Sequence, residues 1–243
     1  MVDVAKSRSI LPLTLTGATA KVRQKLLVGP LNLTIGQQGF SVVMGPNGAG
    51  KTSLLRLMHG LQRLSAGSID WAVDGISARR KQAYVFQAPI MMRRRVLDSI
   101  AFPLILHGVD KKTAWDTAEK WAQRVGLGHV LQSWAPMLSG GEKQKLALAR
   151  ALIYQPEILF LDEPCTNLDG RSTREIEDIL KASQQAGTRI VMATHDMGQA
   201  RRLATDVVFI YDGKVNEKND AVAFFNAPQT LEAQAFINGD IVE

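Results

Sequence analysis

The first part of the chain alternates between apolar and polar residues. Apolar side chains occupy every second position over residues 11–15 and again over residues 31–35. Because successive side chains along a strand point to opposite faces, a period of two predicts strands with one buried face and one wet face. Residues 10–44 are therefore expected to form strands, and the alternation favours an antiparallel layer.

Three later segments are apolar along nearly their whole length, at residues 158–161, 189–194 and 207–211. This pattern is typical of strands that are buried on both faces, as in a parallel sheet covered by helices. A further short strand is expected over residues 83–86, and Asp212-Gly213 predicts a hairpin turn after the last apolar segment. The chain is therefore expected to contain an α/β core.

Between residues 88 and 138 the strand patterns disappear. Residues 96–106 and 113–125 are expected to be helical, and the apolar residues of the second segment fall close to one helix face. We interpret the region as a helical insertion between two halves of the α/β core. Three shorter assignments complete the pattern: a helix from residue 53 to about residue 61, turn-rich chain through Gly67 and Gly75, and at most a short helical tail from about Asp220.

Residues 45–52 fit the pattern G-x-x-x-x-G-K-[ST] at every fixed position. They follow an apolar run and precede a helical pattern, which is the context that a phosphate-binding loop requires. The glycines let consecutive N–H groups point at phosphate oxygens, and the next helix adds the positive end of its dipole. Lys51 would reach the β- and γ-phosphates, and the Thr52 hydroxyl would hold Mg²⁺. The nucleotide-binding residues expected here are Gly45, Pro46, Asn47, Gly48, Ala49, Gly50, Lys51, Thr52 and Ser53; the alternative is a glycine-rich turn without a ligand.

Two adjacent carboxylates, Asp162 and Glu163, end the apolar strand at residues 158–161. Adjacent strand residues point to opposite sides, so the two acids are expected to do different jobs. Asp162 is expected to hold Mg²⁺ together with Thr52, and Glu163 to polarise the water that attacks the γ-phosphate. The alternative is a pair of surface acids that cap a turn before Pro164.

Residues 138–144 read LSGGEKQ and open a helix that is expected to run to about Tyr154. Ser139 and Glu142 fit an S-x-x-E capping box, so a well-capped helix would explain part of the pattern. Two glycines in a first turn cost roughly 1 kcal/mol each against alanine, but they let another group approach the N–H donors closely. This helix start is therefore a candidate second phosphate site. One chain cannot easily bring Lys51 and Ser139 onto the same γ-phosphate, whereas a second chain could.

The composition supports one large α/β domain or two small ones, since the 243 residues are 46% apolar. The single cysteine, Cys165, excludes an intrachain disulfide and is interpreted as a packing residue. The N-terminus lacks the apolar core of a signal peptide, and the apolar stretch at residues 100–106 is far shorter than the roughly 20 residues that cross a bilayer. A formal net charge of +6 permits nucleic acid or an anionic membrane as a neighbour without requiring either. The chain is therefore expected to be soluble by itself, and any membrane role needs a separate partner.

The motifs and their order resemble those of the ATP-binding cassette (ABC) ATPases, the nucleotide-binding subunits of transporters. The resemblance covers about residues 10–220, and the LSGGEKQ sequence is highly specific to this family. It implies an α/β fold: a P-loop NTPase core with an N-terminal antiparallel β layer and an inserted α-helical subdomain. It also implies a single ABC ATPase domain over residues 1–243, with the core at 1–87 and 139–220, the helical subdomain at 88–138 and a short tail at 221–243. The segments that carry it are the phosphate loop, LSGGEKQ, the acid-ended strand, Gln87 after a strand, Asn167-Leu168-Asp169 and Thr194-His195-Asp196.

The family pattern assigns catalytic roles to matching residues. Gln87 resembles the hinge glutamine that touches Mg²⁺ or the attacking water and senses the helical subdomain. His195 resembles the switch histidine that contacts the γ-phosphate and positions Glu163. The resemblance thus implies a catalytic set of Lys51, Gln87, Glu163 and His195, and a metal set of Thr52, Gln87 and Asp162.

The same pattern implies a dimer that closes around two molecules of ATP. Ser139, Gly140 and Gly141 would bind the γ-phosphate of the ATP held by the opposite subunit, and Asp169 would line the interface beside the partner's phosphate loop. Hydrolysis of ATP to ADP and phosphate, with Mg²⁺ as cofactor, would power solute import. The implied partners are a second copy of the chain, integral membrane permease subunits and a solute-binding protein, with no nucleic acid. The chain would be peripheral, at the cytoplasmic face of the inner membrane.

One departure from the family concerns the nucleobase. The family usually places an aromatic residue near the position of Val22, but residues 10–39 contain no Phe, Tyr or Trp. Val22 can give apolar contact to a base but cannot stack a ring on it. The resemblance therefore leaves the choice between ATP and GTP open.

Two neighbouring segments are candidates for contact with a membrane partner. Pro89–Met92 is a candidate docking patch, because exposed methionines suit an adaptable apolar groove; the alternative is that these residues belong to the core. Arg93–Arg95 would face the membrane surface or acidic positions of the partner, unless they are simply solvated.

The transported solute is less well defined by the sequence. Residues 86–94, followed by 101–104 and 107–108, are similar to small importers of oxyanions such as tungstate. Amino-acid importers and lipoprotein-release or division-type cassettes are alternatives of similar size. A soluble cassette ATPase without a transport role is a further alternative. Its translation-factor relatives carry two cassettes, whereas only one fits here, and its DNA-repair relatives carry a very long coiled coil, whereas only about fifty residues lie between Gln87 and Ser139 here. A regulator that does not hydrolyse ATP is disfavoured by Glu163 and His195.

Overall fold

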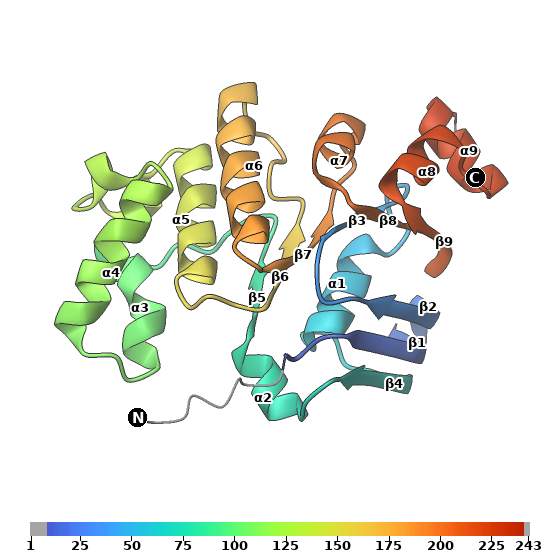
Figure 1. The fold of residues 1–243 in the computed structure, drawn as a ribbon, viewed down its shortest axis with the longest axis horizontal. Helices are drawn as coiled ribbons and strands as arrows, with labels where there is room; N and C mark the ends of the chain where they lie inside the picture. Colours follow the sequence, from blue (N-terminus) through green and yellow to red (C-terminus); the bar gives the residue numbers. More distant parts are fainter. Residues whose placement is uncertain (1–8, 241–243) are drawn as a thin grey trace. The chain divides into compact units, whose positions relative to one another are not determined.

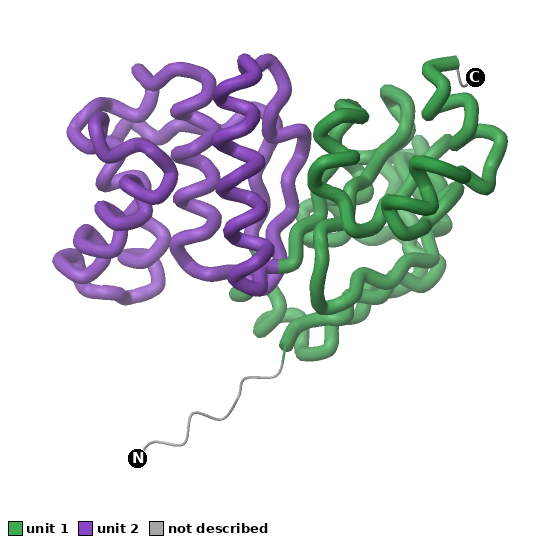
Figure 2. The backbone as a smooth tube through the Cα atoms, turned by 45° about the horizontal axis from the view of Figure 1, so that its top comes forward, with its two compact units in different colours: residues 1–82, 189–243 green, residues 83–188 purple. Residues whose placement is uncertain are grey.

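The computed structural model describes residues 9–240, which form two compact units (Figures 1 and 2). The first unit comprises the described residues up to Gln82 and from Arg189 onward, and the second comprises Ala83–Thr188. This division by compactness differs from the expected split into an α/β core and a helical subdomain at 88–138, which stays a prediction.

The first unit contains a three-stranded sheet in the order β2-β1-β4. Both neighbours pair with β1 in the antiparallel sense, and Leu13 lies opposite Ile35 and Leu15 opposite Leu33. These four apolar side chains are buried, while the polar residues between them are at least partly exposed. The antiparallel layer with one wet face is therefore confirmed. Its strands are β1 (Leu13–Val22), β2 (Lys25–Ile35) and β4 (Ala66–Trp71).

A second sheet in this unit supports the phosphate loop. The strands of this sheet that belong to the first unit lie in the order β7-β3-β8-β9; the first three are parallel, and β9 returns antiparallel to β8. Every residue of β3 and β7 is buried, as expected for a sheet covered on both faces. The hairpin turn after β8 has positive φ at Asp212 (44°) and Gly213 (72°), which confirms the turn. The strands are β3 (Phe40–Met44), β7 (Arg189–Ala193), β8 (Asp206–Tyr211) and β9 (Lys214–Asp220).

Part of the chain that was expected to be rich in turns after the phosphate loop forms a strand and a helix, so this expectation was wrong. Residues of β4 pair with β1 at the edge of the first sheet, and α2 begins after Asp74, whose carboxylate accepts the N–H groups of Ile76 and Ser77. The sequence of β4, AGSIDW, is half exposed and lacks a clear alternation, so only its pairing with β1 defines it. The helices of the first unit are α1 (Lys51–His59), α2 (Gly75–Arg80), α7 (Met197–Leu203), α8 (Ala221–Asn226) and α9 (Leu231–Asn238).

The second unit combines a strand pair with a helical layer. Its strands β5 and β6 are neighbours, and the expected helix over 96–106 is found at those residues. The expected helix over 113–125 is found as α4, which buries Ala114, Ala118 and Ala122 on one face. The elements are β5 (Gln82–Val85), α3 (Val96–Leu106), α4 (Lys111–Arg124), the 3-10 helices η1 (Gly128–Val130) and η2 (Ala135–Met137), α5 (Gly140–Leu152), β6 (Ile158–Asp162) and α6 (Gly170–Gln185).

Alanines allow the helices of the second unit to pack closely. The small side chains of α4 meet Val96 and Ile100 of α3 and Leu146 and Ala149 of α5 in one apolar cluster. Trp115 and Trp121 pack at the edge of this cluster. Lys111 and Arg124 place their charged groups over these two rings, at 4.5 and 4.8 Å from the ring centroids, so that the aromatic edge is covered by cationic side chains.

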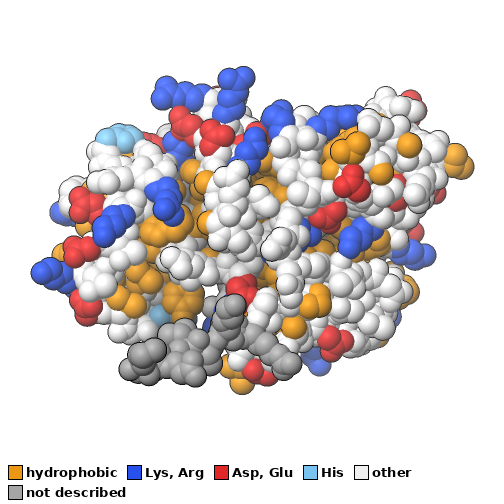
Figure 3. Space-filling model, viewed as in Figure 1, with side chains coloured by type: hydrophobic (Ala, Val, Ile, Leu, Met, Phe, Trp, Pro, Cys, Tyr) orange, Lys and Arg blue, Asp and Glu red, His pale blue; other side chains and the backbone are white. Residues whose placement is uncertain are grey.

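Charged residues do not gather into one stripe on the face drawn in Figure 3, where Lys and Arg are interspersed with Asp and Glu. Across residues 9–240 no helix has both the length and the apolar character needed to cross a bilayer.

One buried ion pair joins the beginnings of three strands of the first unit. Arg189, at the start of β7, is 2% exposed, and its Nη2 donates to Ser41 Oγ on β3 and, at 3.0 Å, to Asp206 Oδ1 on β8. Burial alone raises the pKa of Asp206, but the Ser41 hydroxyl and the Arg189 guanidinium outweigh it and hold this pKa below its ordinary value. The carboxylate is therefore the charged partner that a buried guanidinium needs.

Replacing Asp206 with Asn should lower the free energy of unfolding by about 3 kcal/mol at pH 7, because it leaves the Arg189 charge buried without its counter-charge. Since the pKa of Asp206 is depressed in the folded state, its contribution is complete above the ordinary carboxyl pKa of about 4 and is lost as the pH falls through the lower folded-state value. The difference between variant and wild type, measured by urea unfolding, should thus shrink below pH 4. The exposed Asp116→Asn serves as control; equal stability of the two variants at pH 7 would contradict the role of the pair.

Candidate functional site

At two positions of the phosphate loop the backbone conformation and the close packing allow only glycine. Gly45 and Gly50 have φ of 151° and 106°. A Cβ at Gly45 would lie 2.1 Å from the carbonyl oxygen of Ile210, and a Cβ at Gly50 would lie 2.5 Å from Cγ1 of Val28. The loop is therefore packed tightly against its own unit, and no larger residue fits at these positions without moving backbone or core.

Lys51 is held across this loop. Its side chain is buried at 6% exposure, and its Nζ donates to the carbonyl oxygens of Gly45 at 2.8 Å and Pro46 at 3.0 Å. The helix α1 begins at Lys51 without a side-chain cap and without an acidic residue in its first turn. A cation beside a helix N-terminus without an acidic neighbour is the arrangement that suits a phosphate group. The residues present therefore fit the triphosphate of a nucleotide.

His195 follows β7 at the same edge of the sheet. In the parallel pair, Val43 of β3 lies opposite Ala193 of β7, and the N–H of Thr194 donates to the Val43 carbonyl at 3.3 Å. The chain after β7 thus leaves the sheet beside the start of the phosphate loop. His195 is exposed there, and Asp196 next to it caps α7 by accepting the N–H of Gln199 at 2.8 Å.

In the second unit the two carboxylates at the end of β6 have different partners. Asp162 is 2% exposed and accepts the Tyr84 hydroxyl at 3.2 Å. The Oε2 atom of Glu163 accepts Gln87 Nε2 at 3.3 Å and Thr166 Oγ1 at 2.9 Å. The two carboxylates thus point to different partners, but the alternation of side chains along a strand is not the reason.

Glu163 lies beyond β6 in a left-handed conformation with φ of 47°. A residue other than glycine in such a conformation costs of order 1–3 kcal/mol and persists only where the surroundings hold it. The backbone thus re-aims the Glu163 carboxylate away from the direction that a continued strand would give it.

The LSGGEKQ segment forms the predicted capping box. The Ser139 hydroxyl accepts the Glu142 N–H at 3.4 Å, while Glu142 Oε2 accepts the N–H and the hydroxyl of Ser139 at 2.9 and 2.7 Å. A close approach at Gly141 is made by the same chain, because a Cβ there would lie 2.7 Å from Ser172 Oγ on α6. Gly140 has ordinary space around it, with Leu168 Cδ2 at 3.6 Å from a built Cβ.

The first turn of α6 lies beside this segment. Asp169 caps α6 by accepting the Ser172 N–H at 2.8 Å, and this hydrogen bond is the main cause of its lowered pKa. The Ser172 side chain therefore contacts both the LSGGEKQ turn and the Asp169 cap. The two turns that carry Ser139 and Asp169 are packed together within the second unit.

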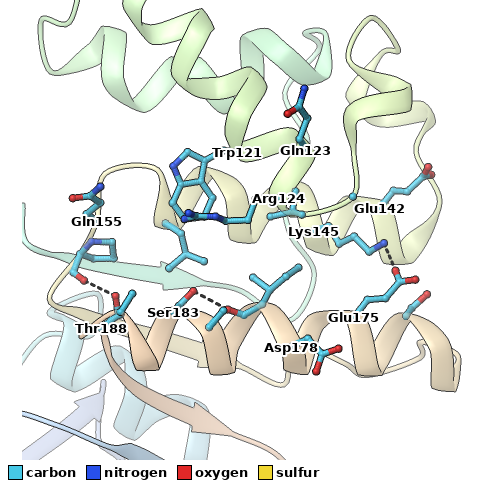
Figure 4. Close-up of a pocket in the computed structure, with 18 of the residues that line it drawn as sticks. Trp121, Gln123, Arg124, Glu142, Lys145, Gln155, Glu175, Asp178, Ser183 and Thr188 are labelled. Carbon is cyan, nitrogen blue, oxygen red and sulfur yellow. Dashed lines mark hydrogen bonds and ion pairs between the residues drawn. The ribbon is translucent and has the colours of Figure 1, made fainter.

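Salt bridges hold α5 and α6 side by side. Glu175 on α6 binds Lys145 on α5 through Oε2 and Arg171 through Oε1, the latter at 3.0 Å. A groove of about 1470 Å³ runs past Lys145 and Glu175 between α4, α5 and α6 (Figure 4). Ser139 and Asp169 are also among its lining residues. The lining contains no residue of the phosphate loop, so the groove is not the part of the predicted ATP site that Lys51 belongs to.

The expected site residues thus fall into two sets. Residues 45–53 and His195 belong to the first unit, whereas Gln87, Asp162, Glu163, Asp169 and the Ser139 turn belong to the second. Sequence reasoning missed three side chains that contact them. Thr166 follows Glu163 by three positions and could have been noticed, but the contacts of Tyr84 and Ser172 join segments whose proximity the sequence does not reveal.

The residues expected to hold Mg²⁺ are oxygen donors, as this ion requires. Within residues 9–240 no three His, Cys, Asp or Glu side chains gather into a metal-binding group. Mg²⁺ usually takes only one or two carboxylates from a protein and completes its shell with phosphate and water. The predicted set of Asp162, the Thr52 hydroxyl and the Gln87 amide has this sparse composition, and it stays a prediction.

The expected docking patch is only partly exposed. Ile90 is 77% exposed, but Met91 and Met92 are half-buried and Met91 packs against the apolar cluster of α3, α4 and α5. The segment is therefore exposed at Ile90 and packed against the core at Met91, and its role in docking stays a prediction. Arg93–Arg95 are exposed; the Arg94 guanidinium lies 4.2 Å from the ring centroid of Phe102, and Arg95 donates to Gln132.

Comparison with known proteins agrees with the fold and the motifs. The family model of the ABC transporters matches residues 28–166. A solved dimer of the ATP-binding cassette MJ0796, in a post-hydrolysis state with ADP and Pi, superposes with a TM-score of 0.77 at 25% identity and covers 86% of this chain and 98% of that chain. The α/β fold with its N-terminal antiparallel sheet is therefore that of an ABC cassette.

Several ATP-binding proteins of transporters are similar over most of their length. The tungstate uptake system ATP-binding protein TupC of Peptoclostridium acidaminophilum is 36% identical over 188 residues, which are 76% of this chain and 88% of that protein. The phosphate import ATP-binding protein PstB 2 of Natronomonas pharaonis is 34% identical over 225 residues, 82% of this chain and 77% of that protein. The glutamate transport ATP-binding protein GluA of Corynebacterium efficiens is 32% identical over 219 residues, 85% of this chain and 90% of that protein. The chain thus belongs to the ABC transporter family, as an ATP-hydrolysing, ATP-binding subunit of the importer type.

Proposed function

We propose that two copies of this chain close around ATP and Mg²⁺ and drive solute import through separate permease subunits at the cytoplasmic face of the membrane. The observation that carries the proposal is the phosphate loop itself, in which a buried Lys51 lies beside an uncapped helix N-terminus. This arrangement supplies positive charge and N–H donors where a triphosphate needs them.

Each site residue has a role in this proposal. Lys51 neutralises the β- and γ-phosphates, and Thr52 with Asp162 holds Mg²⁺, with Gln87 as a further ligand. Glu163 accepts a proton from the attacking water, and His195 contacts the γ-phosphate. Mg²⁺ supplies charge neutralisation when it is bound. The Ser139 turn and Asp169 would meet the nucleotide and the phosphate loop of the second copy.

The contacts of Glu163 support its role as general base. Its carboxylate accepts hydrogen bonds from Gln87 and Thr166 through one oxygen. Those bonds orient the carboxylate, which the proposal assigns to the attacking water. The strained backbone at this residue is the kind of local cost that functional sites carry.

A tungstate-like oxyanion is the solute that we propose first. The support is the similarity to the tungstate protein TupC, together with the similarity to the phosphate protein PstB 2. Amino-acid import is the second candidate, favoured by the similarity to GluA over 85% of the chain. For the nucleobase, Val22 and Leu26 at the end of the β1–β2 hairpin are 50% and 44% exposed, so we propose an aliphatic contact that admits GTP beside ATP.

Replacing Glu163 with Gln should lower the ATPase rate at least about 100-fold while ATP binding is retained, because the amide cannot accept the proton of the water. The variant should accumulate as an ATP-bound dimer, which light scattering can detect. The exposed Glu119→Gln on α4 is the matched control. Turnover at the wild-type rate in the Glu163 variant would remove the base assignment.

Replacing Lys51 with Ala should weaken ATP binding about tenfold to a hundredfold, the equivalent of losing one or two hydrogen bonds to a charged group. Isothermal titration with a non-hydrolysable ATP analogue measures this affinity. Lys112→Ala, on the exposed face of α4, should bind as the wild type does. Unchanged affinity in the Lys51 variant would show that the loop does not hold the nucleotide.

Purification of the tagged chain, with whatever it binds, from its native cells tests the transport role. Membrane subunits should co-purify with the chain, and the associated solute-binding protein should retain tungstate or molybdate in ligand screening. Retention of an amino acid would transfer the assignment to the second candidate. Recovery of the chain with ribosomes or DNA, and without membrane subunits, would contradict a transport role.

A further inference from the structure

Glu142 divides its two carboxylate oxygens between two neighbours. Oε2 accepts the N–H of Ser139 at 2.9 Å and its hydroxyl at 2.7 Å. Oε1 lies 3.4 Å from Nε2 of His129, which belongs to η1 and precedes the LSGGEKQ segment by nine residues. One carboxylate thus connects an imidazole to the serine that opens α5.

The hydrogen bond to Ser139 has a consequence for phosphate binding. A serine hydroxyl has a single proton to donate, and here it is donated to Glu142. For Ser139 to donate to a phosphate oxygen, it has to release Glu142. If a phosphate of the second copy binds at Ser139, as proposed, it would lie next to the negative charge of Glu142, and like charges repel each other.

His129 lies where its charge can change both the hydrogen bond from Ser139 to Glu142 and the repulsion between Glu142 and a phosphate. The side chain of His129 is 68% exposed. Imidazole is, as a type, the side chain whose charge changes between pH 5 and pH 8. The bonds from Ser139 and the charge of His129 together hold the pKa of Glu142 below its ordinary value. A protonated His129 would make Glu142 a weaker acceptor for Ser139 and would offset its repulsion of phosphate.

Other charged groups around Glu142 are engaged elsewhere. The groove beside it is also lined by Arg124 of α4, Lys145 of α5, and Asp169, Arg171 and Glu175 of α6. Lys145 and Arg171 are both bound to Glu175, Asp169 caps α6, and Arg124 lies over the ring of Trp121. His129 is therefore the group that the structure places at Oε1 of Glu142.

We propose that His129 is a positioning residue for Ser139: when it is protonated, it draws Glu142 toward itself and frees the Ser139 hydroxyl for the γ-phosphate of ATP carried by a second copy of the chain. This inference rests on the proposed function, because it assumes that Ser139 meets such a phosphate. It assigns to His129 no contact with ATP. Its effect is on the pH dependence of ATP-driven association.

The test compares three charge states of residue 129 in the Glu163→Gln background, in which hydrolysis is blocked. The variants are His129 itself, His129→Gln, which is neutral at every pH, and His129→Lys, which stays cationic from pH 6 to pH 8. Light scattering gives the ATP concentration for half-maximal dimerisation at pH 6 and at pH 8. Because the three proteins differ only at residue 129, the contributions of all other groups cancel in the comparison.

The quantity to compare is the ATP concentration for half-maximal dimerisation at pH 8 divided by the same concentration at pH 6. For the parent protein with His129 this ratio should be about two- to fivefold larger than for His129→Gln, the range expected for an exposed ion pair. His129→Lys should dimerise at the lower ATP concentration at both pH values. Equal ratios for the parent and His129→Gln would overturn the inference while leaving the proposed function intact. Matching thermal midpoints of the three proteins exclude a folding defect as the cause.

A second measurement needs no nucleotide. The sequence contains four histidines, at positions 59, 107, 129 and 195, so the imidazole NMR signals can be assigned one by one. At pH 6.5 Glu142→Gln should shift the His129 signal and leave the other three unchanged. An unmoved His129 signal would contradict the contact. If no protein dimerises with ATP at either pH, the proposed function fails, and the NMR shift alone decides whether His129 acts on Glu142.

Discussion

The close packing of the phosphate loop is the constraint on which the rest of the account depends. At Gly45 the backbone passes so near the Ile210 carbonyl that a single methyl group would overlap it, and at Gly50 it passes Val28 in the same way. This packing fixes where α1 begins and where Lys51 lies. Strand β8, which carries Ile210, is in turn joined to β3 and β7 through the Arg189 ion pair. The buried core of the first unit thus determines the geometry of its nucleotide-binding loop.

The second unit uses a different device, in which two helix starts are held together. Ser139 and Asp169 cap α5 and α6, Ser172 fills the space beside Gly141, and Glu175 ties the two helices one turn further on. Capping residues are usually structural, because they satisfy N–H groups at a helix start. Here the Ser139 hydroxyl that caps α5 is also the one proposed to bind a phosphate. Its hydrogen bond to Glu142 and the proposed hydrogen bond to phosphate both require its single proton.

Much of the fold could be predicted because its elements have strong local patterns. The helix over residues 96–106, the fully buried strands and the Asp212-Gly213 hairpin all follow from periodicity or turn chemistry. Strand β4 could not be predicted, because its half-exposed residues have no pattern of their own and only the pairing with β1 defines them. The direction of Glu163 also depends on a left-handed backbone that the sequence does not mark.

The candidate site shows the same division. Motifs located the phosphate loop, the acids and the capping box, and the capping box was confirmed down to its hydrogen bonds. The side chains that adjust these residues, such as Tyr84 beside Asp162 and His129 beside Glu142, come from segments that only the folded chain brings together. The roles of the motif residues in catalysis stay predictions.

The central claim is that Lys51 of one copy and Ser139 of another act on the same triphosphate. It can be tested by mixing two inactive variants, Lys51→Ala and Ser139→Phe, under conditions that exchange subunits. In a mixed dimer one of the two sites combines an intact Lys51 with an intact Ser139, so a one-to-one mixture should recover about a quarter of the wild-type ATPase rate if each chain contributes to both sites of a symmetric dimer. An ATPase rate that stays at the level of the separate variants, with mixed dimers shown to be present, would contradict the account.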